Sequence, residues 1–324
     1  MTGVAMVGTR MWAPRLAAAA ERAGLTLVTC YGRSEERCSA FAEQFGCVPA
    51  DSLEEAIGHP EVEGVVLATP NDTHEEQALA AAAQGRHVFV EKPIADTLEA
   101  GERMRGACRD AGVAMMVGHA FRRLGAARRT RELIGEGALG EVVLAEANMS
   151  LPGSFGPGAW RAERARNPGG PIMQLGIHHV DTLAYWLGPI ARASGTFAHL
   201  HTDADIDDVG VVTLEFRSGA LGVVTGSYVS PKTLSMRLCG SEGVLDYRTD
   251  FSVWPDAAAL DSVTELTLNG EPVAFEERDM LAEELAEFGA CIRGETAIET
   301  GAEEGLGALG AVLEALGERR TVVA

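Results

Sequence analysis

The sequence predicts an α/β fold made of two domains, and three of its features support this prediction. Up to about residue 120, short apolar runs alternate with helical stretches of ten or more residues, which indicates parallel βαβ units. These runs are apolar throughout, as expected for strands that helices cover on both faces. Beyond that point the chain changes to short strands joined by tight turns, which indicates an antiparallel or mixed sheet. We therefore expect domains at residues 1–119 and 120–324.

The first domain is expected to contain five strands with helices between them. The apolar runs predict strands over residues 4–7, 25–31, 62–68, 86–90 and 113–117. Helices are predicted over residues 14–23, 35–45, 74–84 and 98–111. Because the strands should be parallel, their carboxyl ends should lie along one edge of the sheet, where ligands bind in this type of fold.

The second domain is expected to combine a sheet with helices on one face. Helices are predicted over residues 125–135, from about 170 to 187, and over 280–293 and 303–319. Strands are predicted over residues 142–149, 195–200, 209–216, 221–228, 234–239 and 243–247, with a hairpin turn at 217–219. If the other face of this sheet is apolar, it would form an interface between copies of the chain.

The composition is typical of a soluble globular protein and limits its partners. Of the 324 residues, 46% are hydrophobic and 23% are charged, and the formal net charge is −20. Nucleic acid and anionic membrane surfaces require a basic face, so this charge argues against both as partners. No run approaches the roughly twenty apolar residues of a membrane span. Six scattered cysteines without metal-ligand spacing indicate reduced thiols in the cytoplasm and no metal site.

The turn after the first predicted strand lies where a dinucleotide-binding fold places its glycine-rich loop. It reads Gly8-Thr9-Arg10-Met11-Trp12-Ala13 and leads into a predicted helix. Gly8 fits the tight first turn, and Ala13 is small enough for the contact between helix and strand. Arg10 stands where a second glycine usually lets the backbone approach the pyrophosphate, so its side chain must turn away or bind a phosphate. We expect residues 8–12 to bind the cofactor.

The end of the second predicted strand favours NADP over NAD. NAD enzymes keep a carboxylate about twenty residues past the loop, where it binds the ribose hydroxyls. The corresponding position here is Gly32, which leaves room for a 2′-phosphate. Arg33, Ser34 and Arg37 would supply two cations and a hydroxyl to that phosphate. The alternative is that both arginines form solvent-exposed ion pairs with neighbouring glutamates.

Two further segments carry groups suited to acid–base chemistry. The strand expected over residues 86–90 ends in Glu91-Lys92-Pro93, which projects an ammonium from the carboxyl edge of the sheet. About eighty residues later, a Gly-Gly turn precedes Gln174 and His178. Imidazole titrates near neutral pH, so His178 is the best candidate for the proton carrier. Lys92 would hydrogen-bond the substrate oxygen and stabilise the negative charge that develops there.

These residues resemble the Gfo/Idh/MocA oxidoreductases, the family of glucose–fructose oxidoreductase and inositol dehydrogenase. The similarity extends over essentially the whole chain and is carried by residues 68–74, 85–93, 169–181 and 304–315. It implies a Rossmann domain followed by an α/β domain with an open, mostly antiparallel sheet that commonly builds dimers or tetramers. It also implies hydride transfer between a bound nicotinamide and a carbinol or carbonyl carbon, usually of a sugar, a sugar derivative or a cyclitol.

The resemblance also implies roles for particular residues. Thr69, Pro70, Asn71 and His74 would lie beside the nicotinamide half of the cofactor, and Glu91 near the nicotinamide ribose. The peptide bond before Pro93 is often cis in the family, which indicates a constrained turn.

One residue departs from the family pattern. Many members carry aspartate four residues before the histidine, where this chain has Gln174. Glutamine can orient a hydroxyl or the imidazole, but it cannot accept a proton or offset an imidazolium charge. We therefore expect a less basic His178 than in the aspartate enzymes.

The contacts to the substrate are less sharply predicted. Asp181 is expected to bind a substrate hydroxyl or orient a contact, or else to form a cap or a salt bridge. Trp160 and Arg161 would reach the nicotinamide or a substrate oxygen, and Arg122 would face the cleft or solvent. The glycine- and proline-rich loop at 151–167 is expected to form a lid.

Together these features predict a cytoplasmic, NADP-preferring oxidoreductase acting on a secondary alcohol or ketone of a sugar-like ring. Lys92 and His178 would meet at one face of the nicotinamide, with Gln174 assisting. Three alternatives stay open: a reductase of a non-sugar imine or enone, a redox-inactive NADP-binding regulator, and an enzyme whose tightly bound cofactor supports net redox-neutral chemistry.

Overall fold

The structure is a computed structural model that describes residues 2–153, 159–254, 256–318 and 320–322. The chain divides into two compact units, one formed by residues 1–120 and 280–306 and the other by residues 121–279 and 307–324. The boundary after residue 120 lies close to the predicted one. The predicted second domain, residues 120–324, is not one uninterrupted unit, because residues 280–306 belong to the first unit.

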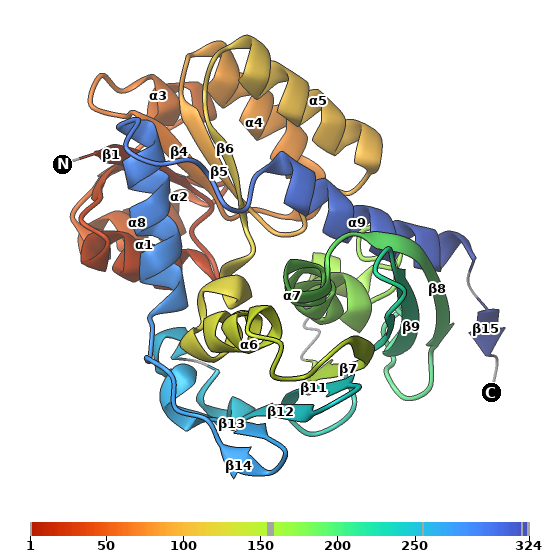
Figure 1. Cartoon of the computed structure of the whole chain (residues 1–324). Coiled ribbons are helices and arrows are strands. Elements are labelled where there is room, and N and C mark those ends of the chain that lie inside the picture. The colour runs from red at the N-terminus through yellow and green to blue at the C-terminus, as the bar shows by residue number, and fades with distance from the viewer. Residues whose placement is uncertain (1, 154–158, 255, 319, 323–324) are drawn as a thin grey trace. The chain divides into compact units, whose positions relative to one another are not determined.

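Apolar packing explains this correction. Helix α8 (Met280–Ile292) places Phe288 against Phe89 of the first sheet, with the ring centroids 5.8 Å apart. Gly64 makes room for the helix, since a Cβ atom there would lie 2.7 Å from Ile292 Cδ1. Figure 1 shows α8 beside α1 (Ala13–Arg22), the first helix of the chain. The segment after residue 280 therefore completes the core of the first unit.

The first unit is built on a six-stranded parallel sheet with the order β3-β2-β1-β4-β5-β6. The order reverses between β1 and β4, which is the switch point where such sheets bind ligands. Its strands are β1 (Gly3–Val7), β2 (Thr26–Tyr31), β3 (Val48–Pro49), β4 (Gly64–Leu67), β5 (His87–Glu91) and β6 (Met115–Gly118). The sequence predicted all of them except β3, whose two exposed residues form no apolar run.

Three helices on this sheet, α2, α3 and α5, begin at side-chain caps that the sequence supplies. Ser34, Ser52 and Thr97 each accept a hydrogen bond from a backbone N–H in the first turn of the helix that follows. The helices between the strands, after α1, are α2 (Glu35–Phe45), α3 (Leu53–Gly58), α4 (His74–Ala83) and α5 (Leu98–Asp110). The six-residue α3 was not predicted because it is too short for a clear helical spacing.

The second unit contains a nine-stranded sheet with the order β14-β13-β12-β11-β7-β10-β9-β8-β15. Its neighbours are antiparallel except for the parallel pairs β7–β10 and β8–β15, so the prediction of a mostly antiparallel sheet is confirmed. The strands are β7 (Val142–Ser150), β8 (Ile190–Ala198), β9 (Val209–Phe216), β10 (Leu221–Ser227), β11 (Thr233–Gly240), β12 (Val244–Thr249), β13 (Thr264–Leu268), β14 (Glu271–Pro272) and β15 (Arg320–Val322). The strand predicted at 195–200 begins five residues earlier, and β13 to β15 were not predicted.

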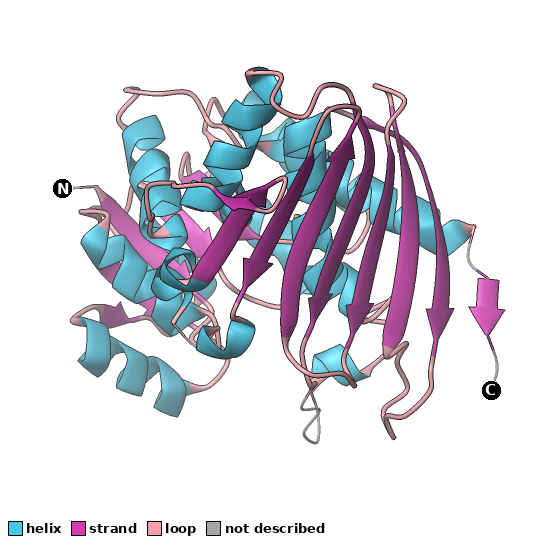
Figure 2. Ribbon diagram, turned by 60° about the horizontal axis from the view of Figure 1, so that its bottom comes forward, coloured by secondary structure: helices cyan, strands magenta, loops and turns pink. Residues whose placement is uncertain are grey.

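Helices lie on one face of this sheet, and Figure 2 shows the other face toward the viewer with the helices behind it. The residues of β9 alternate accordingly, with Val212 and Leu214 buried and Val211 and Thr213 exposed. The covering elements include α6 (Gly125–Gly135), a π-helical turn (Ile172–Gly176), α7 (Ile177–Leu187) and α9 (Ala302–Gly317), which begins in the first unit.

The π-helical turn approaches the sheet closely, and a glycine permits this approach. A Cβ atom at Gly210 of β9 would lie 2.5 Å from Ile172 Cγ1. The helix predicted from about residue 170 therefore begins with a wide turn before the regular α7. Among the described residues, none of the helices is both long and apolar enough to span a bilayer. A cytoplasmic location stays a prediction.

Candidate active site

The turn from β1 to α1 has the backbone that a dinucleotide fold requires. Gly8 adopts φ +100° and donates its N–H to Tyr31 O at 2.8 Å. A Cβ atom at this position would lie 2.6 Å from Ala68 O at the end of β4, so only glycine fits. Arg10, at the position usually held by a second glycine, is exposed, and no side chain caps the start of α1. The turn therefore fits the pyrophosphate of a dinucleotide.

The end of β2 is tightly packed at the position of the carboxylate that NAD enzymes use. A Cβ atom on Gly32 would lie 3.0 Å from Thr9 Oγ1 and 3.3 Å from Cys38 Sγ. Arg33 and Arg37 are both exposed beside it. The Ser34 hydroxyl accepts a hydrogen bond from the backbone N–H of Arg37 at 3.4 Å, so it also caps α2. The arrangement leaves two exposed cations near the predicted position of a 2′-phosphate.

The residues of the loop after β4 are held by hydrogen bonds of their side chains and by burial. The Thr69 hydroxyl donates to Gln77 Oε1 at 2.6 Å, Pro70 is extended, and Asn71 is buried at the start of a short 3₁₀ turn (Asn71–Thr73). His74 has no exposed surface, and its ring nitrogens lie 3.0 Å from Thr69 O and 3.1 Å from Pro93 O. Burial lowers the pKa of His74.

His74 therefore has a clear structural role in the loop. Its imidazole joins the loop after β4 to the loop after β5. The ring has no exposed surface, and its predicted place beside the nicotinamide half of the cofactor stays a prediction. It fixes the relative position of Thr69 and the segment that follows Lys92.

The end of β5 brings Lys92 next to the predicted cofactor turn. Glu91 is 8% exposed, and its Oε1 accepts a hydrogen bond of 2.7 Å from Trp12 Nε1. Its other oxygen accepts from the backbone N–H of Lys92 at 3.2 Å. Lys92 itself is half-buried, and the peptide bond to Pro93 is cis, as the resemblance implied. Within the first unit, the Glu91 carboxylate thus joins two other predicted residues, Trp12 and Lys92.

In the second unit, His178 lies in α7 against an aromatic ring. The imidazole is 6% exposed, and its centroid lies 4.4 Å from that of Phe121, with 36° between the two planes. Phe121 in turn lies 6.0 Å from the partly exposed indole of Trp254. The neighbouring His179 is fully buried, contacts Asn148 O at 3.2 Å through Nε2, and has its pKa lowered to about 4 by burial. Of the two histidines, only His178 therefore keeps any exposed surface.

Gln174 lies in the π-helical turn and is held by two polar neighbours. Its Oε1 accepts from Arg161 Nε at 3.4 Å, and its Nε2 donates to Asn167 Oδ1 at 3.1 Å. Asn167 also donates to Arg161 O at 2.9 Å. The guanidinium of Arg161 stacks on Trp160, 4.6 Å from the ring centroid. Three of the predicted residues, Gln174, Trp160 and Arg161, therefore belong to one network, in which Asn167 is the member that sequence reasoning missed.

Asp181 and Arg122 form a buried ion pair with each other. Two hydrogen bonds of 2.7 and 2.6 Å join the guanidinium to both carboxylate oxygens, and their side chains are only 8% and 1% exposed. Of the alternatives open for Asp181, the structure shows the salt bridge, and Arg122 is buried rather than exposed to solvent. The reason is mutual charge neutralisation, since neither group is stable alone in a buried place.

The remaining expectation concerns the loop at 151–167. Residues 154–158 of this predicted lid lie outside the described residues. In its described part, Arg164 pairs with Asp205 at 3.2 Å and with Asp207.

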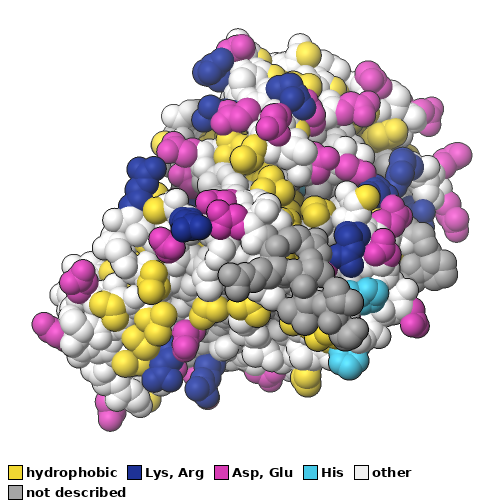
Figure 3. Space-filling view, turned by 90° about the vertical axis from the view of Figure 1, so that its right-hand side faces the viewer, with side chains coloured by type: hydrophobic (Ala, Val, Ile, Leu, Met, Phe, Trp, Pro, Cys, Tyr) yellow, Lys and Arg dark blue, Asp and Glu magenta, His cyan; other side chains and the backbone are white. Residues whose placement is uncertain are grey.

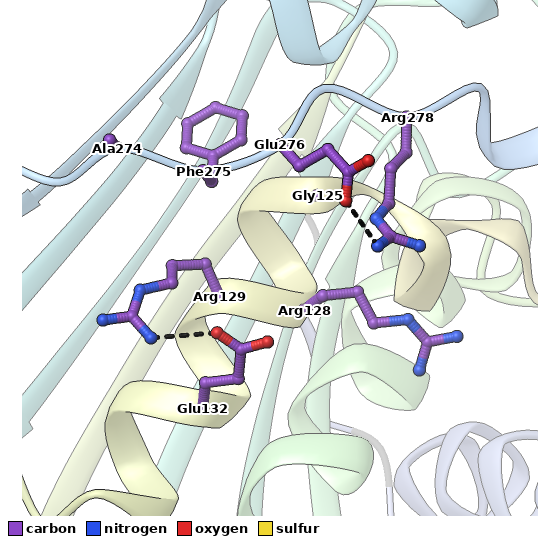
Figure 4. A pocket seen from close by; sticks show the side chains of 8 residues that line it. All are labelled: Gly125, Arg128, Arg129, Glu132, Ala274, Phe275, Glu276 and Arg278. Atoms are coloured by element: carbon purple, nitrogen blue, oxygen red, sulfur yellow. Dashed lines mark hydrogen bonds and ion pairs between the residues drawn. The ribbon is translucent and has the colours of Figure 1, made fainter.

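A surface pocket of about 380 Å³ on the second unit lies elsewhere (Figure 4). Arg129 is paired there with Glu132 at 2.9 Å, and Arg278 with Glu276 at 2.8 Å. The third guanidinium that lines the pocket, that of Arg128, donates to Tyr185 Oη at 2.7 Å. We assign no ligand to this pocket. Figure 3 shows the same mixture on one face of the molecule, where acidic side chains are spread widely and basic ones lie among them.

The residues that sequence reasoning missed are contacts between distant segments. Phe121 follows the fifth predicted strand, and Trp254 lies among short 3₁₀ turns that no pattern predicted. The pairing of Trp12 with Glu91 spans 79 positions. Phe121 and Trp254 are of residue types common in a core, so the sequence gave no signal of a role for them, and it did not show that Trp12 and Glu91 pair with each other.

The doubly wound parallel sheet, with its glycine turn at the switch point, defines an NAD(P)-binding fold, and its matches in sequence agree. A family profile for oxidoreductases with an NAD-binding Rossmann fold matches residues 2–119, and the profile of the Gfo/Idh/MocA C-terminal domain matches residues 127–246. The chain therefore belongs to the Gfo/Idh/MocA family of oxidoreductases. The resemblance, the fold class and the prediction of an oxidoreductase are confirmed.

Individual relatives support the same assignment. A 1,5-anhydro-D-fructose reductase of Ensifer adhaerens is 29% identical, with 88% of this chain and 86% of the relative covered. A D-xylose 1-dehydrogenase [NADP(+)] of Haloarcula marismortui is also 29% identical, with 93% and 86% covered. The crystal structure of a Desulfitobacterium hafniense protein, described as an NADPH-dependent oxidoreductase, has 34% identity and a TM-score of 0.93, with 98% and 95% covered.

Proposed function

We propose that this protein is an NADP-preferring oxidoreductase that interconverts a secondary alcohol and a ketone on a sugar or cyclitol ring. The observation that carries the proposal is the Glu91 carboxylate, which joins the turn at residues 8–12 to the backbone of Lys92. A cationic side chain thus emerges beside the cofactor turn, at the carboxyl edge of the parallel sheet. Relatives that act on 1,5-anhydro-D-fructose and D-xylose support the sugar class.

The roles of the side chains follow from their chemistry. The bound nicotinamide accepts or supplies the hydride. The Lys92 ammonium donates a hydrogen bond to the substrate oxygen and stabilises the negative charge that develops there. His178 takes the hydroxyl proton during oxidation and returns it during reduction, while Phe121 holds the plane of its ring. Gln174, fixed by Arg161 and Asn167, orients a substrate hydroxyl or the imidazole.

The preference for NADP rests on the surroundings of Gly32. Any side chain at this position would press on Thr9 and Cys38, which disfavours the carboxylate that binds the ribose of NAD. Arg33 and Arg37 are exposed and long enough to pair with a 2′-phosphate. The D-xylose dehydrogenase of Haloarcula marismortui, which is named for NADP, supports the same choice.

The experiment that tests the function is a panel of aldoses, ketoses and cyclitols followed at 340 nm with NADP or NAD. We expect turnover of at least one sugar or cyclitol, with kcat/KM higher for NADP. Replacing Lys92 by Ala should lower kcat by about 10²- to 10³-fold, as expected for losing one donor to a developing oxyanion. Turnover of imines or enones alone would contradict the sugar class. Tightly retained cofactor with no net oxidation would favour redox-neutral chemistry.

The cofactor preference has its own matched pair of variants. Gly32→Asp should lower kcat/KM with NADP about tenfold or more, because a carboxylate repels the 2′-phosphate. Gly106→Asp adds the same charge in α5, where no atom lies within 4 Å of the new Cβ, and should leave the ratio unchanged. A wild-type preference for NAD would refute the NADP assignment.

We also propose that the uncovered face of the nine-stranded sheet joins copies of the chain. Leu144 and Leu221 are exposed and lie opposite each other on adjacent strands, and Val211 is exposed on the next strand. The face also carries Glu146 and Thr213, so it is mixed rather than apolar. Native mass spectrometry of Leu221→Asp should show loss of the dimer or tetramer, and a monomeric wild type would refute the proposal.

A further inference from the structure

One buried carboxylate connects the cofactor turn to the proposed catalytic lysine. Trp12 Nε1 donates to Glu91 Oε1 at 2.7 Å, and the backbone N–H of Lys92 donates to Glu91 Oε2 at 3.2 Å. The Glu91 side chain is 8% exposed, so it is largely removed from water. A displacement of the indole therefore changes the hydrogen bonding of the group that holds the Lys92 backbone.

The indole is itself fixed to the turn by its neighbours. The Arg15 guanidinium lies 5.3 Å from the Trp12 ring centroid and donates to Met11 O at 2.8 Å. Met11 has φ 45°, an unusual left-handed conformation for a residue of this type, and its side chain is 67% exposed. The position of the indole thus depends on the conformation of the turn expected to hold the pyrophosphate.

The chemistry of the contact explains why tryptophan is needed. A carboxylate that is removed from water requires donors, and hydrogen bonds to a charged acceptor are about twice as strong as neutral ones. The indole N–H can only donate a hydrogen bond and never accept one, so its polarity matches the carboxylate oxygen. Phenylalanine would fill the same space but leave Oε1 without this bond. Gly118 allows the close approach, since a Cβ there would lie 3.2 Å from Glu91 Oε1.

We propose that Trp12 is a positioning residue that couples the cofactor-binding turn to Lys92 through Glu91. The proposal rests on the proposed function, in which residues 8–12 bind NADP and Lys92 acts on the substrate oxygen. NADP bound to the turn would hold the turn and its indole in this arrangement, the indole holds the carboxylate, and the carboxylate holds the backbone from which the ammonium extends. Lys92 thereby reaches its reacting orientation only when the cofactor turn is in place.

The composition of the chain offers a direct test that does not require turnover. Only two of the 324 residues are lysines, Lys92 and the exposed Lys232. Trace acetylation followed by peptide mass spectrometry gives the labelling rate of Lys92 relative to Lys232 as internal reference. In the wild type, we expect NADP to change this ratio severalfold. In Trp12→Phe, the change should fall to less than half.

A matched control separates coupling from general loosening. Trp186→Phe also removes an indole hydrogen bond, the one of 3.0 Å to Ala127 O in the second unit, and should keep the full response to NADP. Glu91→Gln keeps a carbonyl oxygen for Trp12 but shares it between two donors, so its response should fall as well. If Trp12→Phe responds like the wild type, or if NADP does not change the wild-type ratio although it binds, the coupling is refuted.

Kinetics provide the second readout. Trp12→Phe should lower kcat by roughly 10- to 100-fold, the effect of losing one hydrogen bond to a charged group, and change KM for NADP less. The double variant with Glu91→Gln should lose little more than either single variant. A loss confined to KM would refute the positioning role. If the wild type turns over no sugar, the proposed function fails, whereas the labelling experiment still decides the coupling.

Discussion

Breaking the ion pair between Arg122 and Asp181 should strongly destabilise the second unit. Both hydrogen bonds are short, at 2.7 and 2.6 Å, and the side chains are 8% and 1% exposed. Arg122→Ala would leave the Asp181 carboxylate in a buried place without its guanidinium. Removing one partner of such a pair costs about 3–5 kcal/mol. For a unit of this size, that corresponds to a fall in Tm of about 6–20 °C.

Thermal and urea unfolding would measure this effect against two controls. Arg128→Ala removes a guanidinium that bonds Tyr185 Oη at 2.7 Å, and it should cost only about 1 kcal/mol. The double variant Arg122→Met with Asp181→Leu removes both charges and should recover most of the lost stability. The same variants show whether Asp181 acts on the substrate. If the pair is only structural, its loss should lower Tm and leave KM for the substrate nearly unchanged.

Two results would refute this reasoning. An unchanged Tm in Arg122→Ala would show that the pair contributes nothing to the folded state. An Asp181→Asn variant with wild-type stability but a raised KM for the substrate would instead assign the carboxylate to substrate binding.

Three further predictions concern pH and the cofactor turn. The folded protein binds a proton at His179 with a pKa of about 4, below the ordinary 6.5, so stability is full above about pH 6.5 and falls as the pH drops toward 4. Urea unfolding between pH 4 and 7 should show this fall in the free energy of unfolding. In His179→Gln the fall should be smaller, by up to about 3 kcal/mol. Gly8→Ala, which forces a Cβ to 2.6 Å from Ala68 O at φ +100°, should destabilise the protein by roughly 1–3 kcal/mol and abolish NADP binding in a fluorescence titration. Gln174→Asp should move the pH–rate profile to higher pH, because a carboxylate makes His178 more basic. An unchanged profile would show that the side chain at position 174 does not act on His178.

The strands in the middle of the first sheet could be predicted because they are largely buried on both faces and are therefore mostly apolar. Positions that follow such strands, like Gly8, Gly32 and Lys92, could then be placed on one edge of the sheet. β3 could not be predicted, since its edge position leaves Val48 exposed. The destination of α8 was also unpredictable, because an apolar helix face does not specify which sheet it will cover.

The contacts within the site were mostly beyond sequence reasoning. That Arg122 neutralises Asp181 depends on the packing of a 3₁₀ turn (Ala120–Arg123) against α7, which no spacing encodes. The resemblance placed His74 near the cofactor but could not show that both of its ring nitrogens face backbone carbonyls. Residue type and local pattern identify candidate chemistry, whereas burial decides which candidates can reach a ligand.

The return of α8 to the first sheet has a consequence for biosynthesis. The ribosome releases residues 1–120 long before residues 280–306, so the nascent parallel sheet must wait with Phe89 lacking its partner ring. Apolar surface left bare in this interval invites aggregation, and a fragment that stops at residue 120 would share this defect. The parallel sheet of residues 1–120 therefore completes its core only after residues 280–306 have been synthesised.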